Sequence, residues 1–357
     1  MSPRVRPAAV CLPLLLAACS LLASCGSTNT AKHPQALAPI GAGLEGPAGL
    51  TATVYAKGPP TTAAFAFDGQ GRLWLTAAGL ETHTHDGVYL IARAGSPAEE
   101  IVNGLDDPLG IDWYQNRLYV ASIGRVDVFG GFNGTRFTRH TKILTGPVAG
   151  AENNLLVMAP DGRFVMGVTA TCDHCAPTSV WSGSIVSFLP DGGGLRLYAA
   201  RIRAPFGLAF FPGTSNLLVS MNQRDDLGAA TPGDWLALVR EGENWGFPGC
   251  YGQGGAVCAG VPAPIAVLDK HGAVGGIAIV TGQLGASIGT SAIVPEWNVA
   301  KVQRVALTAS GSRYSGSVTP FLTGIANPLA IALAADHSLL VGDWATGAIY
   351  RISAQGS

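Results

Sequence analysis

Acidic residues and histidines occur in short polar segments of the chain, where they could carry acid–base chemistry. Glu152 follows Gly150-Ala151 and precedes two asparagines, and His271 follows Asp269-Lys270. A partly buried glutamate with a raised pKa can act as a general base, and histidine titrates near neutral pH. We take Glu152 and His271 as candidate catalytic bases. The alternative is a solvated loop carboxylate and a histidine that only forms hydrogen bonds.

Two pairs of polar side chains have the types that metal ions prefer. Asp225-Asp226 offers carboxylate oxygens to calcium, a hard ion, although Asp side chains also cap turns. His83 and His85, two residues apart, could bind a metal if both side chains lay on one face of an extended strand. Otherwise they are two unrelated histidines of an exposed loop.

Four cysteines follow Cys25, namely Cys172, Cys175, Cys250 and Cys258. An even number in an exported protein indicates disulfides. We favour the pairs Cys172–Cys175 and Cys250–Cys258, because both close short loops. The alternative is a metal or redox site at Cys172-Asp173-His174-Cys175, which would need further ligands from elsewhere in the chain.

The elements that must position these residues form an internal repeat. An apolar strand, a polar tight turn and a second apolar strand recur, with copies at 65–75, 110–120, 156–166, 208–219 and 331–341 and a degraded copy at 276–294. Steps of roughly 45 to 55 residues, with several strands in each unit, are typical of radial β arrays. Third and fourth apolar strands follow most copies, so each unit predicts a four-stranded blade.

The two ends of the repeat region predict how the ring closes. The last copy stops after a third strand at 349–352, and an orphan strand at 50–58 precedes the first copy. We predict an all-β fold, a six-bladed β-propeller whose N-terminal strand closes the last blade, because this pairing leaves no open edge. The long step before the fifth blade predicts an insertion at 241–275.

The propeller prediction brings the polar segments together. The loop after the second strand and the loop before the first strand of each blade emerge on one face. We therefore expect most of the polar segments to converge on this face: 81–86 of the first blade, 150–154 and the Cys172–Cys175 loop of the third, Arg201, Arg203 and 222–226 of the fourth, 269–271 and 296–298 with Lys301 of the fifth, and Asp343-Trp344 of the sixth.

The first residues form a targeting segment. Arg4 and Arg6 precede an apolar stretch at 7–23, as in a secretion signal. Small residues before Cys25, and again before Cys19, resemble the lipobox of bacterial lipoproteins. We predict a lipoprotein signal peptide at 1–24, lipidation of Cys25 (or Cys19), a flexible tether at 25–46 and the propeller at 47–357. The alternative is secretion without a lipid.

The charge and hydropathy of the chain limit the classes of partner that it could bind. The chain has 22 basic and 23 acidic residues, so it offers no electrostatic basis for binding nucleic acid. Beyond the targeting segment, no apolar run reaches the roughly 18 residues of a membrane-spanning helix. We expect an exported protein of the cell envelope or periplasm that contacts the membrane only through its lipid.

One stretch of the chain is more specific than the rest. It contains the blocks 200–210 (Ala-Arg-Ile-Arg-Ala-Pro-Phe-Gly-Leu-Ala-Phe), 222–228 (Asn-Gln-Arg-Asp-Asp-Leu-Gly) and 242–252 (Gly-Glu-Asn-Trp-Gly-Phe-Pro-Gly-Cys-Tyr-Gly). These blocks resemble the glucose/sorbosone dehydrogenase family, soluble propellers that use pyrroloquinoline quinone (PQQ). The segment 171–175 and the closing Gly342-Asp343-Trp344 resemble its sorbosone branch. The resemblance covers the chain from Leu50 onward.

The resemblance implies a cofactor, a metal and a reaction. In the family, PQQ and a calcium ion lie on the top face, a His removes the proton of a sugar hydroxyl, and a hydride moves to the quinone. Arginines and a lysine hold the carboxylates of the cofactor. By resemblance, the cofactor-binding residues here are Arg203, Asn222, Arg224 and Lys301, and the calcium ligands are Asp225 and Asp226.

The sequence departs from the family pattern at three places. The catalytic His would fall near Ala151, Ala204 replaces the Asn that follows the Arg at 203, and 295–298 lacks an expected Arg. A general base contributes about 10²- to 10⁴-fold in rate, so Glu152 or His271 would have to substitute for the missing His.

Three functions stay open. The first is PQQ-dependent oxidation of a sugar, alcohol or aldehyde outside the cytoplasm, which the Asp225-Asp226 and 245–248 blocks favour. The second is a non-catalytic propeller of the same family that binds a carbohydrate or an envelope partner, which the missing His favours. The third is metal-assisted hydrolysis with His83, His85 and His271.

Overall fold

The computed structural model describes residues 36–356 except 147, 149–151 and 312. The predicted signal peptide and both candidate lipidation sites, Cys19 and Cys25, lie outside these residues. The described part is built of strands and turns with three short 3₁₀ helices, η1 (Leu80–Thr82), η2 (Gly228–Ala230) and η3 (Ala256–Cys258). No helix of this part is long and apolar enough to cross a membrane.

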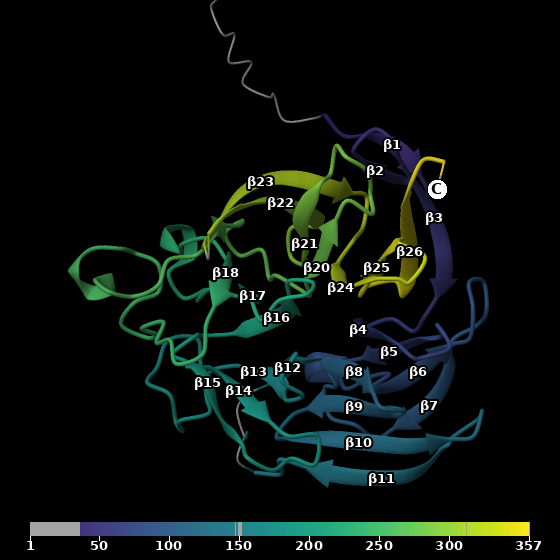
Figure 1. Ribbon diagram of the computed structural model, residues 1–357, viewed down its shortest axis with the longest axis horizontal. Helices are drawn as coiled ribbons and strands as arrows, with labels where there is room; N and C mark the ends of the chain where they lie inside the picture. Colours follow the sequence, from purple (N-terminus) through teal and green to yellow (C-terminus); the bar gives the residue numbers. More distant parts are fainter. Residues whose placement is uncertain (1–35, 147, 149–151, 312, 357) are drawn as a thin grey trace, which may run out of the picture. The chain divides into compact units, whose positions relative to one another are not determined.

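The strands form six antiparallel sheets arranged as blades around a ring (Figure 1). From inner to outer strand, the first three blades are β4 (Thr62–Phe67), β5 (Leu73–Ala77), β6 (Gly87–Ile91) and β7 (Glu99–Asn103); β8 (Gly110–Tyr114), β9 (Arg117–Ser122), β10 (Arg125–Phe132) and β11 (Phe137–Ile143); and β12 (Asn153–Met158), β13 (Phe164–Val168), β14 (Ser184–Phe188) and β15 (Arg196–Ala200).

The other three blades complete the ring. They are β16 (Pro205–Phe210), β17 (Leu217–Met221), β18 (Trp235–Val239) and β19 (Ala266–Val267); β20 (Ala278–Thr281), β21 (Thr290–Glu296), β22 (Lys301–Ser310) and β23 (Arg313–Thr323); and β24 (Pro328–Leu333), β25 (Leu339–Asp343), β26 (Ala348–Ala354) and β3 (Leu50–Lys57). The predicted all-β, six-bladed propeller is therefore confirmed.

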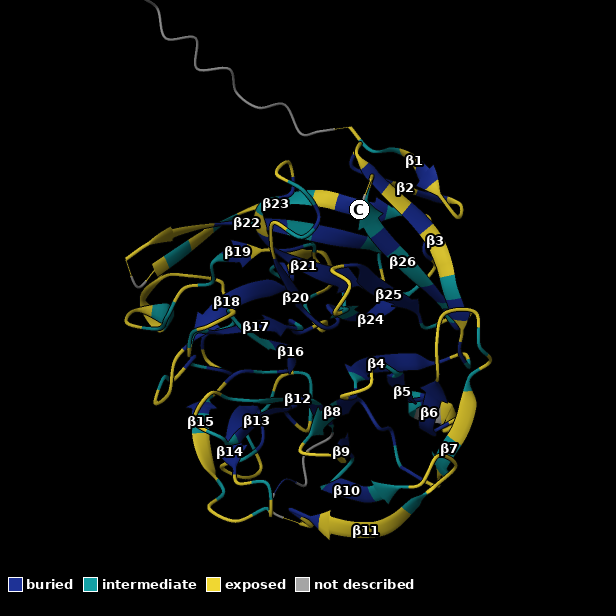
Figure 2. Ribbon diagram, turned by 45° about the vertical axis from the view of Figure 1, so that its right-hand side comes forward, coloured by how far each residue is buried: buried dark blue, intermediate teal, exposed yellow. Residues whose placement is uncertain are grey.

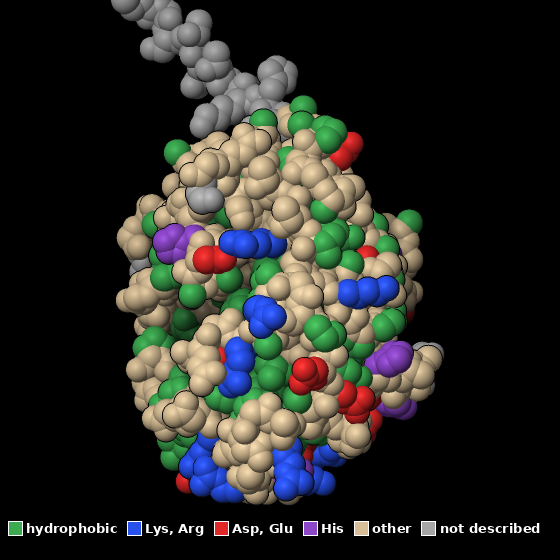
Figure 3. All heavy atoms as spheres, turned by 90° about the vertical axis from the view of Figure 1, so that its right-hand side faces the viewer, with side chains coloured by type: hydrophobic (Ala, Val, Ile, Leu, Met, Phe, Trp, Pro, Cys, Tyr) green, Lys and Arg blue, Asp and Glu red, His purple; other side chains and the backbone are tan. Residues whose placement is uncertain are grey.

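Burial follows the position of a strand in its blade. The second strand β5 is buried along its whole length, whereas the outer strands β7 and β11 are largely exposed (Figure 2). This gradient explains why the inner strands read as continuous apolar runs and the outer ones alternate with polar residues. On the flank in Figure 3, charged side chains of both signs are interspersed, in agreement with a net charge of −1.

The tight turns inside the blades depend on side chains that accept backbone hydrogen bonds. Asp68, between β4 and β5, accepts from the backbone N–H groups of Gln70 and Arg72 and from Trp74 Nε1. Gly71 takes a left-handed backbone conformation there, with φ of +76°, which glycine adopts without steric cost. Such local chemistry is why the turns of the repeat could be read from sequence.

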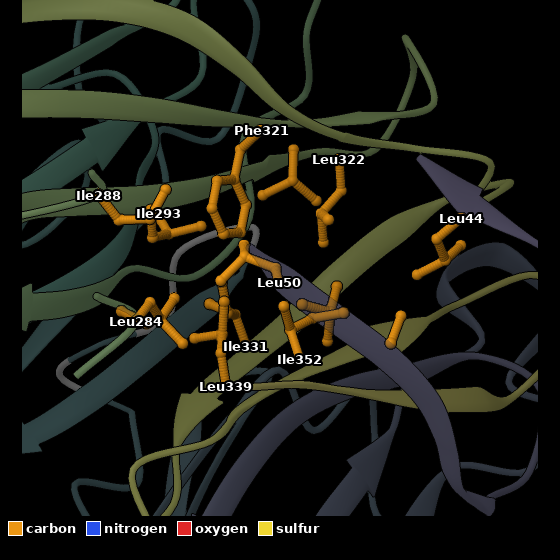
Figure 4. Close-up of a cluster of buried hydrophobic side chains, with 14 of the residues drawn as sticks. Leu44, Leu50, Leu284, Ile288, Ile293, Phe321, Leu322, Ile331, Leu339 and Ile352 are labelled. Carbon is orange, nitrogen blue, oxygen red and sulfur yellow. The ribbon is translucent and has the colours of Figure 1, made fainter. Parts of the chain in front are cut away.

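The ring closes as predicted. β3 pairs antiparallel with β26, with Leu50 opposite Ala354 and Lys57 opposite Ala348. Leu50 is 1% exposed and lies in a cluster of buried side chains from the fifth and sixth blades, including Phe321 and Ile352 (Figure 4). Pairing and packing together join the two ends of the described chain.

The end of the predicted tether is wrong, because ordered strands begin before residue 46. β1 (Ala38–Gly41) and β2 (Leu44–Gly46) form a hairpin, and β2 pairs with β23 through Glu45 and Thr323. Ile40 and Leu44 are buried in the cluster around Leu50. These two apolar residues stabilise a hairpin in a segment whose Pro and Gly content suggested a linker.

The predicted insertion at 241–275 is only partly an insertion. It contains η3, but it also supplies β19, the outer strand of the fourth blade, which pairs with β18. β19 is only two residues long, so its periodicity is too weak to recognise in the sequence.

Candidate active site

A cavity of about 630 Å³ lies where loops from several blades meet. Its lining includes Glu152, Arg203, Asn222, Asp225 and His271, which come from segments widely separated in sequence. The convergence of these polar loops, expected from the propeller topology, is therefore present.

Glu152 immediately precedes β12 and is half-buried at the cavity. Thr169 Oγ1 donates a hydrogen bond to Glu152 Oε2 over 3.4 Å. Burial raises the pKa of Glu152, and the Thr169 hydrogen bond and the Arg203 charge only partly oppose that shift. A carboxyl with a raised pKa that faces a cavity can take up and release a proton.

Arg203 reaches the cavity with its guanidinium already engaged. Its Nη2 donates to Asp173 Oδ1 over 2.5 Å and its Nη1 to the Asn222 carbonyl over 3.1 Å. Asp173 also accepts from the backbone N–H groups of Asp225 and Asp226, at 3.0 and 2.8 Å from its Oδ2. Asp173 thus organises this wall of the cavity, a role that sequence reasoning missed.

Both predicted disulfides are present, Cys172–Cys175 and Cys250–Cys258. The first closes the short loop that carries Asp173, and Cys172 itself lines the cavity. The disulfide therefore constrains the backbone that presents Asp173 to Arg203. The alternative of a metal site at this Cys pair is excluded, because both sulfurs are bonded to each other.

Two buried oxygens at the cavity have no hydrogen-bond donor. The Asn222 side chain donates through Nδ2 to the Val274 carbonyl over 3.3 Å, and its Oδ1 has no partner. Asp234 accepts the Gln223 N–H through Oδ1 over 2.7 Å, and its Oδ2 has no partner. Burial raises the pKa of Asp234 to about 6. Asp234 was not predicted as a site residue.

His271 lies at the cavity with both ring nitrogens engaged. Its Nδ1 is 2.6 Å from Asp225 Oδ1, and its Nε2 is 2.9 Å from the Gly228 carbonyl. The hydrogen bond to Asp225, followed by that to Gly228, raises the pKa of His271. Because two acceptors favour the doubly protonated ring, His271 is a poorer base than Glu152 in this arrangement.

Three of the predicted residues are not among the described residues that line the cavity. Arg224 forms a bidentate ion pair with Asp226, and its guanidinium lies 4.6 Å from the Tyr251 ring centroid. Lys301 is paired with Asp269 and lies 3.9 Å from Glu296. Arg224 and Asp226 are therefore committed to each other within one loop, and Lys301 is committed to Asp269, which only folding brings close.

Aromatic and aliphatic side chains form the apolar part of the cavity. Trp297 and Trp344 meet edge to face with ring centroids 5.4 Å apart, and Trp344 Nε1 donates to the Ala78 carbonyl over 3.0 Å. Phe206 and Leu329 also line it. Flat apolar surfaces next to polar groups suit a planar ring or the face of a sugar.

His83 and His85 do not lie on an extended strand, the condition for a shared site, because both take a left-handed backbone conformation with φ of +49° and +68°. His83 lies beside Asp86, Asp106 and Asp107. His271 is instead bonded to Asp225 and Gly228, so the grouping of His83, His85 and His271 for metal-assisted hydrolysis is not supported by their partners.

No protein-family model matches the chain, and no curated protein matches it. Solved structures do. The holo PQQ domain of pyranose dehydrogenase from Coprinopsis cinerea is 15% identical, with 87% of this chain and 97% of that chain covered and a TM-score of 0.72. PQQ-bound aldose sugar dehydrogenase from Streptomyces coelicolor is 18% identical, with coverage of 86% and 99% and a TM-score of 0.69.

A third similar structure is a calcium structure of a Trichoderma reesei carbohydrate-active enzyme of family AA12. It is 14% identical, with 90% of this chain and 98% of that chain covered and a TM-score of 0.68. At such low identities a similarity over nearly the whole length establishes the architecture. This chain therefore shares its six-bladed propeller fold with these three structures.

Proposed function

We propose that this protein is a PQQ- and calcium-dependent dehydrogenase that oxidises a sugar or a related alcohol or aldehyde. The observation that carries the proposal is the content of one cavity. It combines a half-buried carboxyl with a raised pKa (Glu152), an arginine (Arg203) and two buried oxygens without donors, on Asn222 and Asp234.

The oxygen atoms fit a calcium ion. Calcium takes carboxylate and amide oxygens, and a buried oxygen with no donor is stabilised when a cation takes the donor's place. Asn222 Oδ1 and Asp234 Oδ2 meet this description, with Asp225 beside them on the cavity wall. Asp226, the other ligand expected from sequence, fits poorly because Arg224 already neutralises it.

The remaining lining fits a planar anionic quinone. Arg203 would hold a carboxylate of the cofactor by exchanging its bond to Asp173, and Trp297, Trp344 and Phe206 offer apolar surface to the rings. A calcium ion would offset the excess of carboxylates over arginine in the cavity. When bound, the quinone supplies the acceptor for the hydride of the sugar.

Glu152 would supply the base that the family His provides elsewhere. In its carboxylate form, it accepts the proton of the substrate hydroxyl, while Thr169 holds Oε2 in place. The position near Ala151 where the family places its His lies outside the described residues.

A second candidate function is binding of a carbohydrate without oxidation. The Asp173–Arg203 pair favours it, because the arginine that would hold the cofactor is already engaged, and the Trp297–Trp344 pair could stack on a sugar. The sorbosone branch of the family is proposed on the sequence resemblance alone.

Reconstitution with the cofactor distinguishes oxidation from carbohydrate binding. The purified protein is incubated with calcium and PQQ, and reduction of a redox dye is measured with a panel of aldoses, alcohols and aldehydes. We expect calcium-dependent quinone absorbance on the protein and dye reduction with at least one substrate. Carbohydrate binding on a glycan array without any dye reduction would support the second function and contradict the first.

We further propose that the chain is exported and anchored by a lipid on Cys25 or Cys19, outside the cytoplasm. Two disulfides are consistent with an oxidising compartment. Metabolic labelling with a fatty acid tests the anchor. Label should be lost in Cys25→Ser, or in Cys19→Ser if the earlier lipobox is used. Absence of label from the wild type would refute lipidation, and retention in the double variant would rule out both cysteines as its site.

A further inference from the structure

A second polar cluster lies between the first and second blades, outside the site described above. His83 and Asp86 belong to the loop joining β5 to β6, and Asp106 and Asp107 belong to the connection from β7 to β8. His83 Nδ1 is 3.3 Å from Asp86 Oδ2, 3.5 Å from Asp106 Oδ1 and 3.7 Å from Asp107 Oδ2. Three carboxylates therefore surround one imidazole nitrogen.

Asp107 has a buried carboxylate oxygen that a bound cation would stabilise. Its side chain is 7% exposed, its Oδ2 faces His83, and its Oδ1 is buried without a hydrogen-bond partner. Buried carboxylates are normally paired with a cation or coordinate a metal.

The rest of the cluster is held in place by the backbone. Asp86 accepts from the Gly79 N–H through Oδ1 over 2.6 Å and from the Asp107 N–H through Oδ2 over 2.9 Å. Within the described part of the chain, no lysine or arginine forms an ion pair with any of the three aspartates, and His83 is their ion-pair partner. Three carboxylates exceed one imidazolium in charge, so the cluster favours an additional cation.

We propose that His83, Asp86, Asp106 and Asp107 bind a divalent transition-metal ion of the Zn²⁺ type. Ligand atoms of His83, Asp86 and Asp106 lie within 4.8 Å of one another. A tetrahedral zinc site with bonds of about 2.0–2.1 Å separates its ligand atoms by about 3.3–3.4 Å, close to the separations around His83 Nδ1. The imidazole nitrogen favours zinc over calcium or magnesium, which prefer oxygen donors alone.

The metal would join two blades at the edge of the main cavity. Leu80 and Leu109, which line that cavity, flank the two segments that carry the ligands. Fixing these segments would stabilise this part of the cavity wall. These ligands are a different set of residues from those of the calcium and quinone site, and zinc binding to them does not depend on the proposed oxidation.

Zinc binding to the purified, chelator-treated full chain tests the proposal. Equilibrium dialysis should give one Zn²⁺ per chain, with affinity reduced at least about tenfold in His83→Gln and in Asp106→Asn. Both side chains are about half exposed, at 52% and 48%, so these substitutions should not prevent folding. The matched control is His85→Gln, an exposed histidine of the same loop outside the cluster, which should keep the affinity.

Thermal unfolding provides a second readout. Zn²⁺ should raise the midpoint of the wild type and of His85→Gln but not that of His83→Gln. Absence of saturable zinc binding would mean that His83 only forms ion pairs with the aspartates, and it would overturn the proposal. Zinc affinity that survives His83→Gln but is lost in Asp234→Asn would place the metal in the main cavity, with the same consequence.

Discussion

At the scale of single residues, two carboxyls of the main cavity differ in what their surroundings leave them free to do. Glu152 is half-buried and accepts one hydrogen bond from Thr169, so its proton can exchange with a bound substrate. Asp234 is 2% exposed and keeps one oxygen without a donor, which suits a cation better than proton transfer. The two roles can be tested separately.

Replacing Glu152 with Gln should lower turnover about 10²- to 10⁴-fold, because the amide cannot accept a proton. In the wild type, activity should fall as the pH drops through the pKa of Glu152, which burial raises above the ordinary value of 4.5. Steady-state rates of dye reduction across pH check both. Glu241→Gln, which alters an exposed ion pair with Arg196, is the control. Full turnover in Glu152→Gln would remove Glu152 as the base.

Asp234→Asn should weaken calcium binding about tenfold or more, because it removes a buried ligand charge. Asp226→Asn should leave calcium affinity unchanged, because that carboxylate is paired with Arg224. Isothermal titration with calcium distinguishes them. The reverse outcome would restore the ligand pair predicted from the Asp225-Asp226 sequence.

Only some residues of the site could be predicted from the sequence. Glu152, Arg203, Asn222, Asp225 and His271 could be placed together because blade topology determines which loops share a face. The partner of Lys301 could not be foreseen, because Asp269 is brought close only by folding, whereas Arg224 pairs with Asp226 of the same loop. For the same reason, the free oxygen of Asp234 has no signature in the sequence.

At the scale of elements, the closing strand β3 pairs with β26 and so joins the first and last strands of the propeller. The six blades and this closure were predictable, because alternating apolar residues and Asp-Gly turns are local signals. The β1–β2 hairpin was missed, because two buried side chains in a short Pro- and Gly-rich segment give too weak a pattern.

Leu50→Ala should destabilise the protein by about 2–4 kcal/mol, since it leaves a cavity in the cluster shared by the fifth and sixth blades. Val54→Ala, in the same strand but with Val54 60% exposed, should change the free energy of unfolding by less than about 0.5 kcal/mol. Urea unfolding of both variants measures the difference. Equally small losses of stability in both variants would show that β3 stabilises the protein through its backbone alone.

At the scale of the whole molecule, several buried carboxyls make stability depend on pH. Burial raises the pKa of Asp234 from 3.8 to about 6 and that of Glu296 from 4.5 to about 7. The folded state therefore holds protons that the unfolded state has released. Their stabilising contribution is complete below the ordinary pKa values and is lost as pH rises through the folded ones.

We expect the free energy of unfolding to fall by about 2 kcal/mol or more between about pH 5 and about pH 7.5 in the absence of calcium. Glu296→Gln should reduce this slope, since its amide does not titrate. Asp226→Asn should preserve it, because the Arg224 hydrogen bond lowers the pKa of Asp226 to about 2, outside this range. Urea titrations at a series of pH values measure the slope. Stability that increases over the range would contradict the assignment.

The pairing of Leu50 with Ala354 also has a consequence for biosynthesis. β3 is synthesised before the other strands of the six blades and its partner β26 after them, so β3 stays unpaired until the last blade has been translated. A nascent or truncated product that stops short of β26 keeps a bare strand edge, open to chaperones and proteases. Only products that include β26 can therefore close the ring.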